Sequence, residues 1–462
     1  MAARIRSSLA QAAVTMLAVL VTIAVCLLIA PEPGPAVLGA MLCLTLSRSQ
    51  LERDWRGRLE AGIALPVIGL LSAGVGLLLL NLRILGAMVY VAGMFLSIFL
   101  RRFGPVPRRI GSLLALPFIA LLVAPNPVPS TVHGPFAVLV PALVALVAFA
   151  FVTLFQVAAI AIRLLPRRLP APPEAARAEA PTVAQPHPAL DATTRLALQM
   201  ALSVALAFTI GFLFFSDRWA WIVLTVVVVA VGNAGRADVL YKGIQRVVGA
   251  GIGTVVALLG LTVPTFGGPN LPTVIALLAV VFVALILRPF GYLWWALFFT
   301  VALTLLQSFG SERPGGLGPL LGERLEEILL GTVLALLVAW FVAPVRSENT
   351  VRRRIGAVLG ALQARLAEQT PETAAALTAA EKELARVSPP YTAWRRIFRR
   401  SSRPRAAAWI ATTRDSVALG RDGGSPAARA ALGEARRTLR DPDQLQPALD
   451  RLRATLAGES EL

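Results

Sequence analysis

One pattern of arginine, glycine and threonine occurs twice in otherwise apolar segments of the chain. Its two copies are Arg246-x6-Gly253-Thr254 and Arg324-x6-Gly331-Thr332. Small residues at helical spacing let two membrane helices approach closely, and Gly249 extends the packing face of the first copy. The pattern therefore predicts two close helix contacts near the centre of the protein, which would frame a site between them. The alternative is that they are plain packing contacts.

Carboxylates are few in the apolar segments, and three of them surround the second arginine. Glu323 precedes Arg324, Glu326 and Glu327 follow it, and Glu327 lies four residues before Gly331. Residues four apart share one face of a helix. A carboxyl group held away from water can exchange a proton near neutral pH. We therefore predict a proton-coupling role for Glu327, with Glu326 as its neighbour. The alternative is that these acids complement the dipole at a helix N-terminus.

A second set of candidates combines positive charge with aromatic rings. Arg236 and Arg246 bracket a short segment that we expect to be a flexible cationic loop, able to meet an organic anion. The alternative is the ordinary excess of positive charge in cytoplasmic loops. Three tryptophans offer ring faces to an aromatic substrate, or alternatively belong to an interfacial belt; they are Trp219, Trp294 and Trp295.

Several other chemistries are disfavoured by the sequence. Cys26 and Cys43 both lie in apolar runs, and His133 and His187 are isolated, so we expect neither a disulfide framework nor a metal site. We find no Walker A motif, no G-x-S-x-G and no G-x-G-x-x-G after a strand-like run. ATP-driven transport by this chain is therefore disfavoured, and we expect no cofactor and no enzymatic activity.

The composition places these residues in a membrane protein. Of 462 residues, 56% are hydrophobic and 15% are charged, whereas soluble domains are about a quarter charged. The mean hydropathy is +0.71. A net charge of +18 would suit a nucleic-acid-binding protein, but in a membrane protein arginine-rich cytoplasmic loops are the favoured explanation. We therefore predict an all-α polytopic membrane protein in a lipid bilayer, with no nucleic-acid partner.

Twelve apolar segments are candidate membrane spans. They cover approximately 9–30, 35–47, 61–81, 84–100, 110–124 and 136–162, then 196–215, 219–232, 247–263, 272–288, 291–308 and 325–343. With twelve crossings, nineteen Lys and Arg residues before the tail fall on the side of the N-terminus and four on the other side. The positive-inside rule then places both termini in the cytoplasm.

Two segments are too polar to cross a membrane. Residues 166–192 predict a Pro- and Ala-rich linker, between a first six-helix repeat at 1–165 and a second at 193–345. Residues 346–462 contain 21 Lys and Arg and 13 Asp and Glu with helical periodicity, which predicts a cytoplasmic helical tail.

Internal similarity supports this division. Leu100-Arg101-Arg102-Phe103-Gly104 recurs as Leu287-Arg288-Pro289-Phe290-Gly291, which indicates two parallel repeats. Within the second repeat, the predicted topology places Arg246 at the cytoplasmic end of the ninth span and Arg324 at the outer end of the twelfth. The same motif entering from opposite faces is typical of the inverted repeats of secondary transporters. The alternative is chance similarity in a sequence rich in Leu, Val and Gly.

Three stretches of the second half carry a family resemblance. They are Asp217-Arg218-Trp219-Ala220-Trp221-Ile222-Val223-Leu224-Thr225-Val226, then Arg236, then Arg246-x-x-Gly249-x3-Gly253-Thr254. With them, residues 195–344 resemble the fusaric acid resistance / aromatic acid exporter (FUSC-like) family of bacterial inner-membrane proteins, and Arg324–Gly331 resembles its final helix. The family motif R-x-x-G-T-x-x-G is spread out here. The chain is also similar, more remotely, to plant anion channels of the malate-transporter type.

The resemblance implies a proton-driven exporter of small aromatic carboxylic acids in the bacterial cytoplasmic membrane, coupled in some members to a periplasmic adaptor protein. Our leading hypothesis is a secondary transporter that exports small amphipathic or aromatic organic anions. An uncoupled organic-anion channel and a membrane scaffold that acts through its tail are the alternatives. The adaptor and a homo-oligomer are partners that the sequence leaves open.

Overall fold

The computed structural model describes residues 2–51, 55–123, 136–165, 191–215, 218–233, 235–263, 265–266, 270–308, 318–345, 347–397, 405–421 and 425–460. In these ranges every regular element is a helix. Most of the predicted linker, 166–190, lies outside them, as do His133 and His187. The described residues form two compact units. We call the unit that holds helices α1 to α13 the membrane unit, and the unit that holds α14 to α19 the C-terminal unit.

The helices of the membrane unit coincide with the segments predicted as spans. They are α1 (Ala2–Ile29), α2 (Pro33–Leu51), α3 (Trp55–Asn81), α4 (Arg83–Phe99), α5 (Pro105–Val123), α6 (Phe136–Ala161), α8 (Ala192–Phe214), α9 (Trp219–Ala230), α10 (Arg236–Leu261), α11 (Leu271–Leu287), α12 (Tyr292–Ser308) and α13 (Gly318–Phe341). Among the described residues, eight helices are long and apolar enough to cross a membrane, and three shorter apolar helices lie in α2, α9 and α12. The all-helical membrane protein is therefore confirmed, whereas twelve crossings and two repeats stay predictions.

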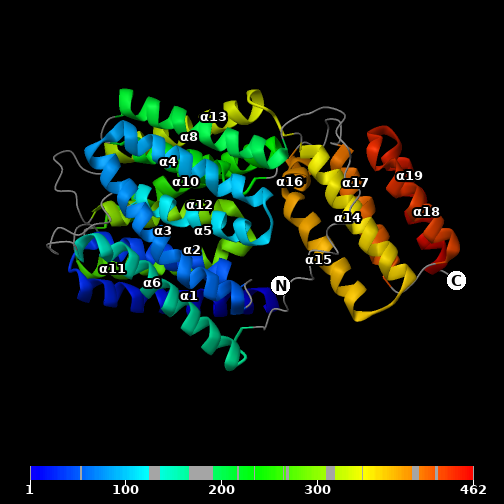
Figure 1. The fold of residues 1–462 in the computed structure, drawn as a ribbon, viewed down its shortest axis with the longest axis horizontal. Coiled ribbons are helices and arrows are strands. Elements are labelled where there is room, and N and C mark those ends of the chain that lie inside the picture. Colours follow the sequence, from blue (N-terminus) through cyan, green and yellow to red (C-terminus); the bar gives the residue numbers. More distant parts are fainter. Residues whose placement is uncertain are drawn as a thin grey trace. The chain divides into compact units, whose positions relative to one another are not determined.

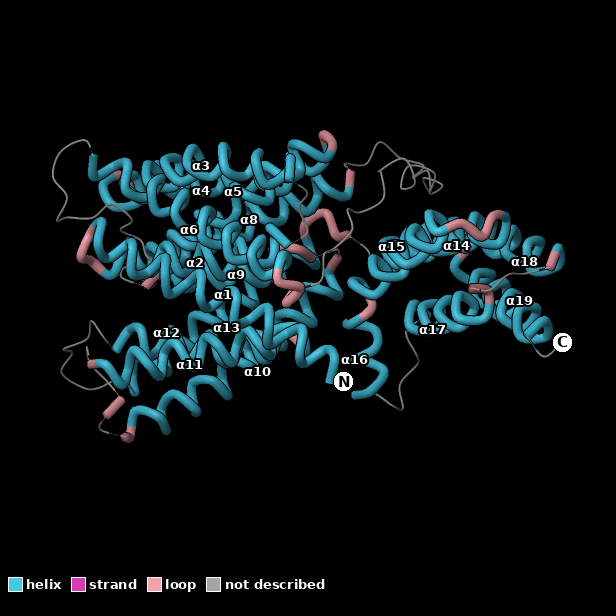
Figure 2. The backbone as a smooth tube through the Cα atoms, turned by 90° about the horizontal axis from the view of Figure 1, so that it is seen from below, coloured by secondary structure: helices cyan, strands magenta, loops and turns pink. Residues whose placement is uncertain are grey.

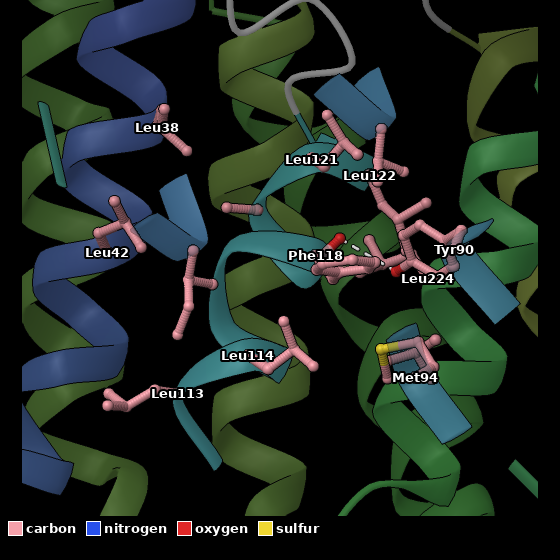
Figure 3. Packing of buried hydrophobic residues seen from close by; sticks show 14 of the residues in the cluster. Leu38, Leu42, Tyr90, Met94, Leu113, Leu114, Phe118, Leu121, Leu122 and Leu224 are labelled. Atoms are coloured by element: carbon pink, nitrogen blue, oxygen red, sulfur yellow. Dashed lines mark hydrogen bonds between the residues drawn. The ribbon is translucent and has the colours of Figure 1, made fainter. Parts of the chain in front are cut away.

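The helices of the membrane unit lie side by side with nearly aligned axes (Figures 1 and 2). Buried Leu, Val and Ala side chains fill the space between them. Tyr90 of α4 is fully buried in this core, and its hydroxyl donates a hydrogen bond to the Phe118 carbonyl of α5 at 3.0 Å (Figure 3). Because the phenol would be costly to bury without a partner, this hydrogen bond fixes α4 against α5.

The sequence similarity between residues 100–104 and 287–291 corresponds to a similar local structure. A short 3₁₀ turn follows α4 at Leu100–Arg102 and follows α11 at Arg288–Phe290. Each turn is followed within two residues by a glycine with positive φ, +111° at Gly104 and +158° at Gly291. Glycine adopts such angles without the steric penalty of a Cβ atom, so both chain reversals use the same device.

The start of α10 differs from the prediction. We expected a flexible loop up to Arg246 and a span from residue 247, but the helix already begins at Arg236. Lys242 lies on this helix and donates a hydrogen bond to the Val231 carbonyl at 2.7 Å, just after the end of α9. The apolar window missed these turns because their polar side chains have partners within the protein.

The C-terminal unit is a separate set of packed helices. They are α14 (Ser347–Ala367), α15 (Pro371–Val387), α16 (Pro389–Ile397), α17 (Arg405–Leu419), α18 (Pro426–Arg437) and α19 (Pro442–Ser460). Asn233–Asp238 also belongs to this unit, and there the Ala237 amide donates to the Ser347 hydroxyl at 3.0 Å. Ser347 therefore caps the first turn of α10 from a distant part of the sequence.

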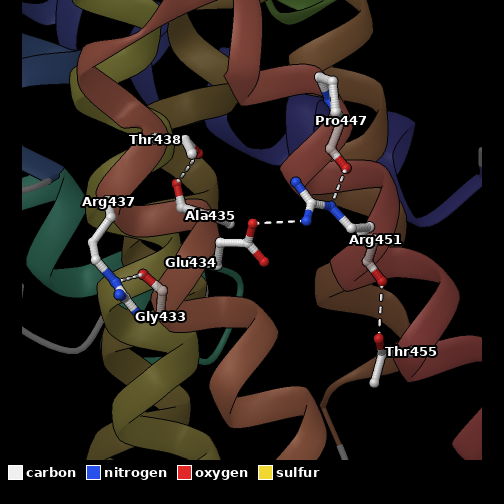
Figure 4. A network of polar contacts seen from close by, with 8 residues as sticks. All are labelled: Gly433, Glu434, Ala435, Arg437, Thr438, Pro447, Arg451 and Thr455. Atoms are coloured by element: carbon white, nitrogen blue, oxygen red, sulfur yellow. Dashed lines mark hydrogen bonds and ion pairs between the residues drawn. The ribbon is translucent and has the colours of Figure 1, made fainter.

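Apolar burial and surface ion pairs hold the C-terminal unit together. Trp409 of α17 is 1% exposed and belongs to a core of Leu, Val, Ile and Ala side chains. At the surface, Arg451 of α19 pairs with Glu434 of α18 at 2.8 Å (Figure 4). Exposed pairs of this kind contribute less than about 1 kcal/mol, so the apolar core dominates the stability of the unit.

We expect Trp409→Ala to destabilise the C-terminal unit by about 3–5 kcal/mol, the usual range for removing a buried aromatic side chain. Trp409→Phe should lower the stability less, because the indole nitrogen has no hydrogen-bond partner among the described residues. Limited proteolysis of the full chain over a temperature series measures the difference. The exposed Arg429→Ala is the control, and equal protease sensitivity of Trp409→Ala and this control would contradict the assignment of the core.

Candidate functional site

A cluster of buried charged side chains lies in the second half of the membrane unit. Arg246 of α10 is 2% exposed, and Arg324 and Glu327 of α13 are 4% and 1% exposed. The sequence places both arginines at the ends of their predicted spans, and the helices begin before those spans. Arg246 lies ten residues into α10 and Arg324 six residues into α13. Neither side chain points into lipid, because both are enclosed by neighbouring helices.

The Arg324 guanidinium is held in a defined orientation. Its Nη1 donates a hydrogen bond to the Gln307 Oε1 of α12 at 2.8 Å, and its Cζ lies 4.2 Å from the centre of the Trp221 ring of α9. Contact with an aromatic face is favourable for a guanidinium group. Its Nε and Nη2 have no hydrogen-bond partner among the described residues. One edge of a buried guanidinium is therefore unsatisfied.

Arg246 adds a second buried positive charge. Its charge and that of Arg324 lie within electrostatic range of each other, and the Tyr292 ring at the start of α12 lies beside it. The Nε of Arg246, like the Nε and Nη2 of Arg324, lacks a hydrogen-bond partner within the described part of the chain. Buried donors are rarely left unpaired, so these groups indicate a place where a polar ligand or water binds.

Glu327 faces a third arginine. Its Oε1 lies 3.6 Å from the Nε of Arg218, the residue before α9, and Arg218 also pairs with Glu323. Glu327 lies nine residues after the start of α13, beyond the first turn where a helix dipole acts. The dipole alternative therefore does not explain its position. The other predicted acid, Glu326, is exposed.

Glycines bring the helices of this region into backbone contact. A Cβ atom added at Gly253 of α10 would lie 2.5 Å from the Leu297 carbonyl oxygen of α12, and one at Gly249 would lie 2.8 Å from the Leu293 carbonyl oxygen. A Cβ atom at Gly331 of α13 would lie 2.9 Å from the Ile222 carbonyl oxygen of α9. No other residue type fits at these positions without movement of a helix.

The two glycine contacts use the same register. Gly253 lies against Leu297 and Thr300 of α12, and Gly331 lies against the residues Ile222 and Thr225 of α9, which have the same spacing. Four residues earlier, Gly249 lies against Leu293 and Glu327 pairs with Arg218. The α10–α12 pair and the α13–α9 pair are therefore matched position for position, except that glycine is replaced by glutamate at 327.

The two threonines of the repeated motif lie beside these glycines. Thr254 and Thr332 are each 4% exposed, and neither hydroxyl has a hydrogen-bond partner among the residues described. The methyl group of Thr332 lies against Gly243, where a Cβ atom would be 2.8 Å away. This contact joins α10 to α13.

The remaining predicted residues lie apart from this cluster. Arg236 is exposed and belongs to the C-terminal unit. Trp219 packs on Phe208 and Phe212 of α8, with ring centres 5.3 and 5.5 Å away. Trp294 is 42% exposed, and Trp295 stacks on Phe299 and against Arg288. The structure does not bring these three tryptophans to the buried arginines.

Sequence reasoning missed four residues of the cluster. The missed side chains are Arg218, Trp221, Tyr292 and Gln307. Gln307 carried a signal, because a lone amide at the end of an apolar helix is costly to bury without a partner. Arg218 was counted only as an outer-loop charge, since the ion pair with Glu327 joins residues 109 positions apart.

The cluster carries a net positive charge. Among the described residues, the buried charged side chains are Arg246, Arg324 and Glu327, which leaves one positive charge in excess when Glu327 is ionised. Charges inside a membrane protein must be neutralised. The arrangement therefore suits an anion of single charge.

The first half of the membrane unit offers no comparable group in the part described. A small crevice there lies between α2, α3, α5 and α6 and is lined by residues such as Leu38, Leu42, Pro117, Leu121 and Ala145. An apolar lining of this kind cannot stabilise a charged ligand, so the charged cluster of the second half is the candidate site.

Comparison with known proteins places this cluster inside a recognised domain. The family model described as fusaric acid resistance protein-like matches residues 201–338, which include Arg218, Arg246, Arg324 and Glu327. The resemblance recognised in the sequence is thereby confirmed for this segment. A search of curated proteins finds no match. The match and the apolar helices together identify a multi-pass membrane protein.

We expect Gly253→Ala to push α10 away from α12 and to destabilise the membrane unit by about 1–3 kcal/mol, as overpacking does. Gly251→Ala is the matched control on the same helix, because a Cβ atom there meets nothing within 4 Å. Thermal unfolding of the purified chain in detergent should show a lower midpoint for Gly253→Ala only. Equal midpoints for the two variants would contradict the close contact.

Proposed function

We propose that the chain, whose residues 201–338 match the family model described as fusaric acid resistance protein-like, is a proton-coupled secondary transporter that exports small amphipathic or aromatic organic anions. The observation that carries the proposal is the buried cluster with one positive charge in excess. The family assignment and the apolar helices support an efflux-type membrane protein rather than an enzyme.

The buried arginines supply the binding energy for the anion. A guanidinium group surrounded by apolar helices loses its hydration, and an organic anion restores both the hydrogen bonds and the charge balance. Arg246 and Arg324 then act as the central binding charges. The exposed Arg236 attracts anions toward the path by long-range electrostatics, and Trp219, Trp294 and Trp295 play no direct part.

The matched glycine contacts support alternating access. If α10–α12 and α13–α9 are equivalent parts of an inverted repeat, each pair can take the conformation of the other, which opens the site first to one side and then to the other. Flat glycine contacts at Gly249, Gly253 and Gly331 allow such movement because no side chains interlock there. The anion site lies between the two pairs in this proposal.

Glu327 is the proposed proton carrier. It is buried and pairs with Arg218, whereas Glu326 is exposed. Protonation of Glu327 removes its ion pair with Arg218 and changes the charge of the cluster by one unit. The cluster therefore has a different charge in each protonation state, which links proton binding to anion binding.

The proposed topology has twelve crossings in a bacterial cytoplasmic membrane with both termini in the cytoplasm. The excess of arginine in the loops on the side of the N-terminus supports this orientation. Two parallel six-helix repeats, of which the first is mainly a scaffold, complete the arrangement. A periplasmic adaptor protein and self-association are further features of the proposal.

We expect reconstituted protein to drive benzoate movement in proteoliposomes under an imposed pH gradient, and Glu327→Gln to lose at least 90% of the gradient-driven flux. The amide keeps the size of the side chain and removes its titration. Radiolabelled benzoate with and without an ionophore that collapses the gradient measures the coupling. Glu368→Gln, an exposed change in the C-terminal unit, is the control.

The alternatives give different results in the same experiment. Downhill benzoate flux of the same size with and without the pH gradient indicates an uncoupled anion channel. Gradient-driven flux lost in Glu326→Gln but not in Glu327→Gln would place the proton on the exposed acid. No flux from the intact chain, together with loss of cellular phenotype on removal of residues 346–462, would favour the scaffold.

A further inference from the structure

We propose that Arg324 grips the carboxylate of the transported anion side-on, through its Nε and Nη2, while Arg246 supplies the second positive charge. This inference rests on the proposed function and assigns its binding group. The sequence pointed to Arg236 and Arg246 for this role and treated Arg324 only as part of a helix motif.

The unsatisfied atoms of Arg324 form one edge of the guanidinium. Nε and Nη2 have no hydrogen-bond partner among the described residues, and their N–H bonds point in the same direction from one side of the planar group. Two parallel N–H donors match the two oxygens of a carboxylate, which is the strongest bidentate geometry available to arginine. The edge that is free is therefore the edge that binds a carboxylate.

Two neighbours fix the plane of this edge before any ligand binds. Gln307 accepts from Nη1 at 2.8 Å on the opposite side of the group, and the Trp221 ring covers one face at 4.2 Å. A donor pair held in position needs little ordering on binding, which strengthens the interaction. Gln307 and Trp221 are positioning residues in this proposal.

The protein's own acids do not occupy the edge. Glu327 lies on the same helix and within electrostatic range of Arg324, but its ion pair is with Arg218 at 3.6 Å. Among the described residues, no carboxylate lies within ion-pair distance of Arg324. Because Arg324 is 4% exposed, bulk water does not serve it either. An external carboxylate is the group whose charge and shape satisfy it.

The charge balance selects a monocarboxylate. The excess of one positive charge in the cluster is neutralised by one monoanion, and a dianion would reverse the imbalance. The aromatic rings of Trp221 and Tyr292 adjoin the arginines, so the body of the ligand meets apolar and aromatic surface. Benzoate is the smallest probe with these properties, and benzamide is its neutral counterpart.

The test is equilibrium binding of labelled benzoate to the full chain in lipid nanodiscs. We expect wild-type protein to bind benzoate at least tenfold more tightly than benzamide. Arg324→Lys keeps the charge but loses the parallel donors, and we expect it to weaken benzoate binding at least tenfold. The same change at the exposed Arg83 is the matched control, and we expect it to leave binding unchanged.

A second variant separates binding from folding. Gln307→Glu is nearly the same size and places a carboxylate on Arg324, so it neutralises the buried charge within the protein. We expect its unfolding midpoint to equal or exceed that of the wild type, while its benzoate affinity falls at least tenfold. Gln307→Glu therefore tests the binding role of Arg324 even where Arg324→Lys fails to fold.

Benzoate binding that is unchanged in Arg324→Lys or in Gln307→Glu would overturn the assignment, as would equal binding of benzoate and benzamide by the wild type. Failure of this assignment and failure of the proposed function are distinguishable. If benzoate flux depends on the pH gradient but benzoate binding is unchanged in Arg324→Lys, the transport proposal holds and the assignment of Arg324 is wrong. Binding that depends on Arg324 in a protein that moves no benzoate supports the site and overturns the transport.

Discussion

The structure of the second half of the membrane unit depends on one constraint, which is the high free energy of an arginine side chain without a partner inside a membrane. Three arginines meet this constraint in different ways. Arg218 pairs with Glu327 and Glu323. Arg324 donates a hydrogen bond from Nη1 to Gln307, and one face of its guanidinium group lies on the Trp221 ring. Its Nε and Nη2 have no hydrogen-bond partner within the described part of the chain. Arg246 lies in electrostatic range of Arg324 rather than beside an acid. An anion would complete this arrangement, which connects the helix packing to the proposed transport.

Much of the fold could be predicted from the sequence because apolar length determines where membrane helices form. Each predicted span coincides with one helix of the membrane unit, and the tail has a helical core of its own. The ends of the helices could not be predicted in the same way. The start of α10 is polar. The hydroxyl of Ser347 accepts a hydrogen bond from the first turn of the helix, and the carbonyl of Val231 accepts one from Lys242. Such partners are distant in sequence or depend on the turn geometry, so hydropathy alone assigns these residues to a loop.

The candidate site was predictable in part. Arg246, Arg324 and Glu327 stand out in the sequence because charge is rare in apolar segments, and the structure buries all three. Their partners were not predictable, because Arg218 and Gln307 reach α13 across 109 and 17 positions and only the packing of α9 and α12 brings them close. The tryptophans show the opposite case. Their aromatic rings suggested a surface that binds a ligand, but Trp219 packs against α8 and Trp294 is exposed. The type of ring alone does not distinguish a ligand contact from packing or exposure.

The one mismatch between the two helix contacts follows from the same constraint. In both contacts the motif glycine lies on a backbone carbonyl, Gly253 on Leu297 and Gly331 on Ile222. One turn earlier the two contacts differ. In the α10–α12 contact, Gly249 lies against Leu293 without a side chain, whereas in the α13–α9 contact Glu327 forms an ion pair with Arg218. A neutral side chain at 327 would fill the space but would leave Arg218 with the half-exposed Glu323 as its acid. A carboxylate at 249 would instead sit against a backbone carbonyl and repel it. The two contacts are therefore alike in shape and different in charge, and this difference gives the cluster a buried carboxylate among its arginines.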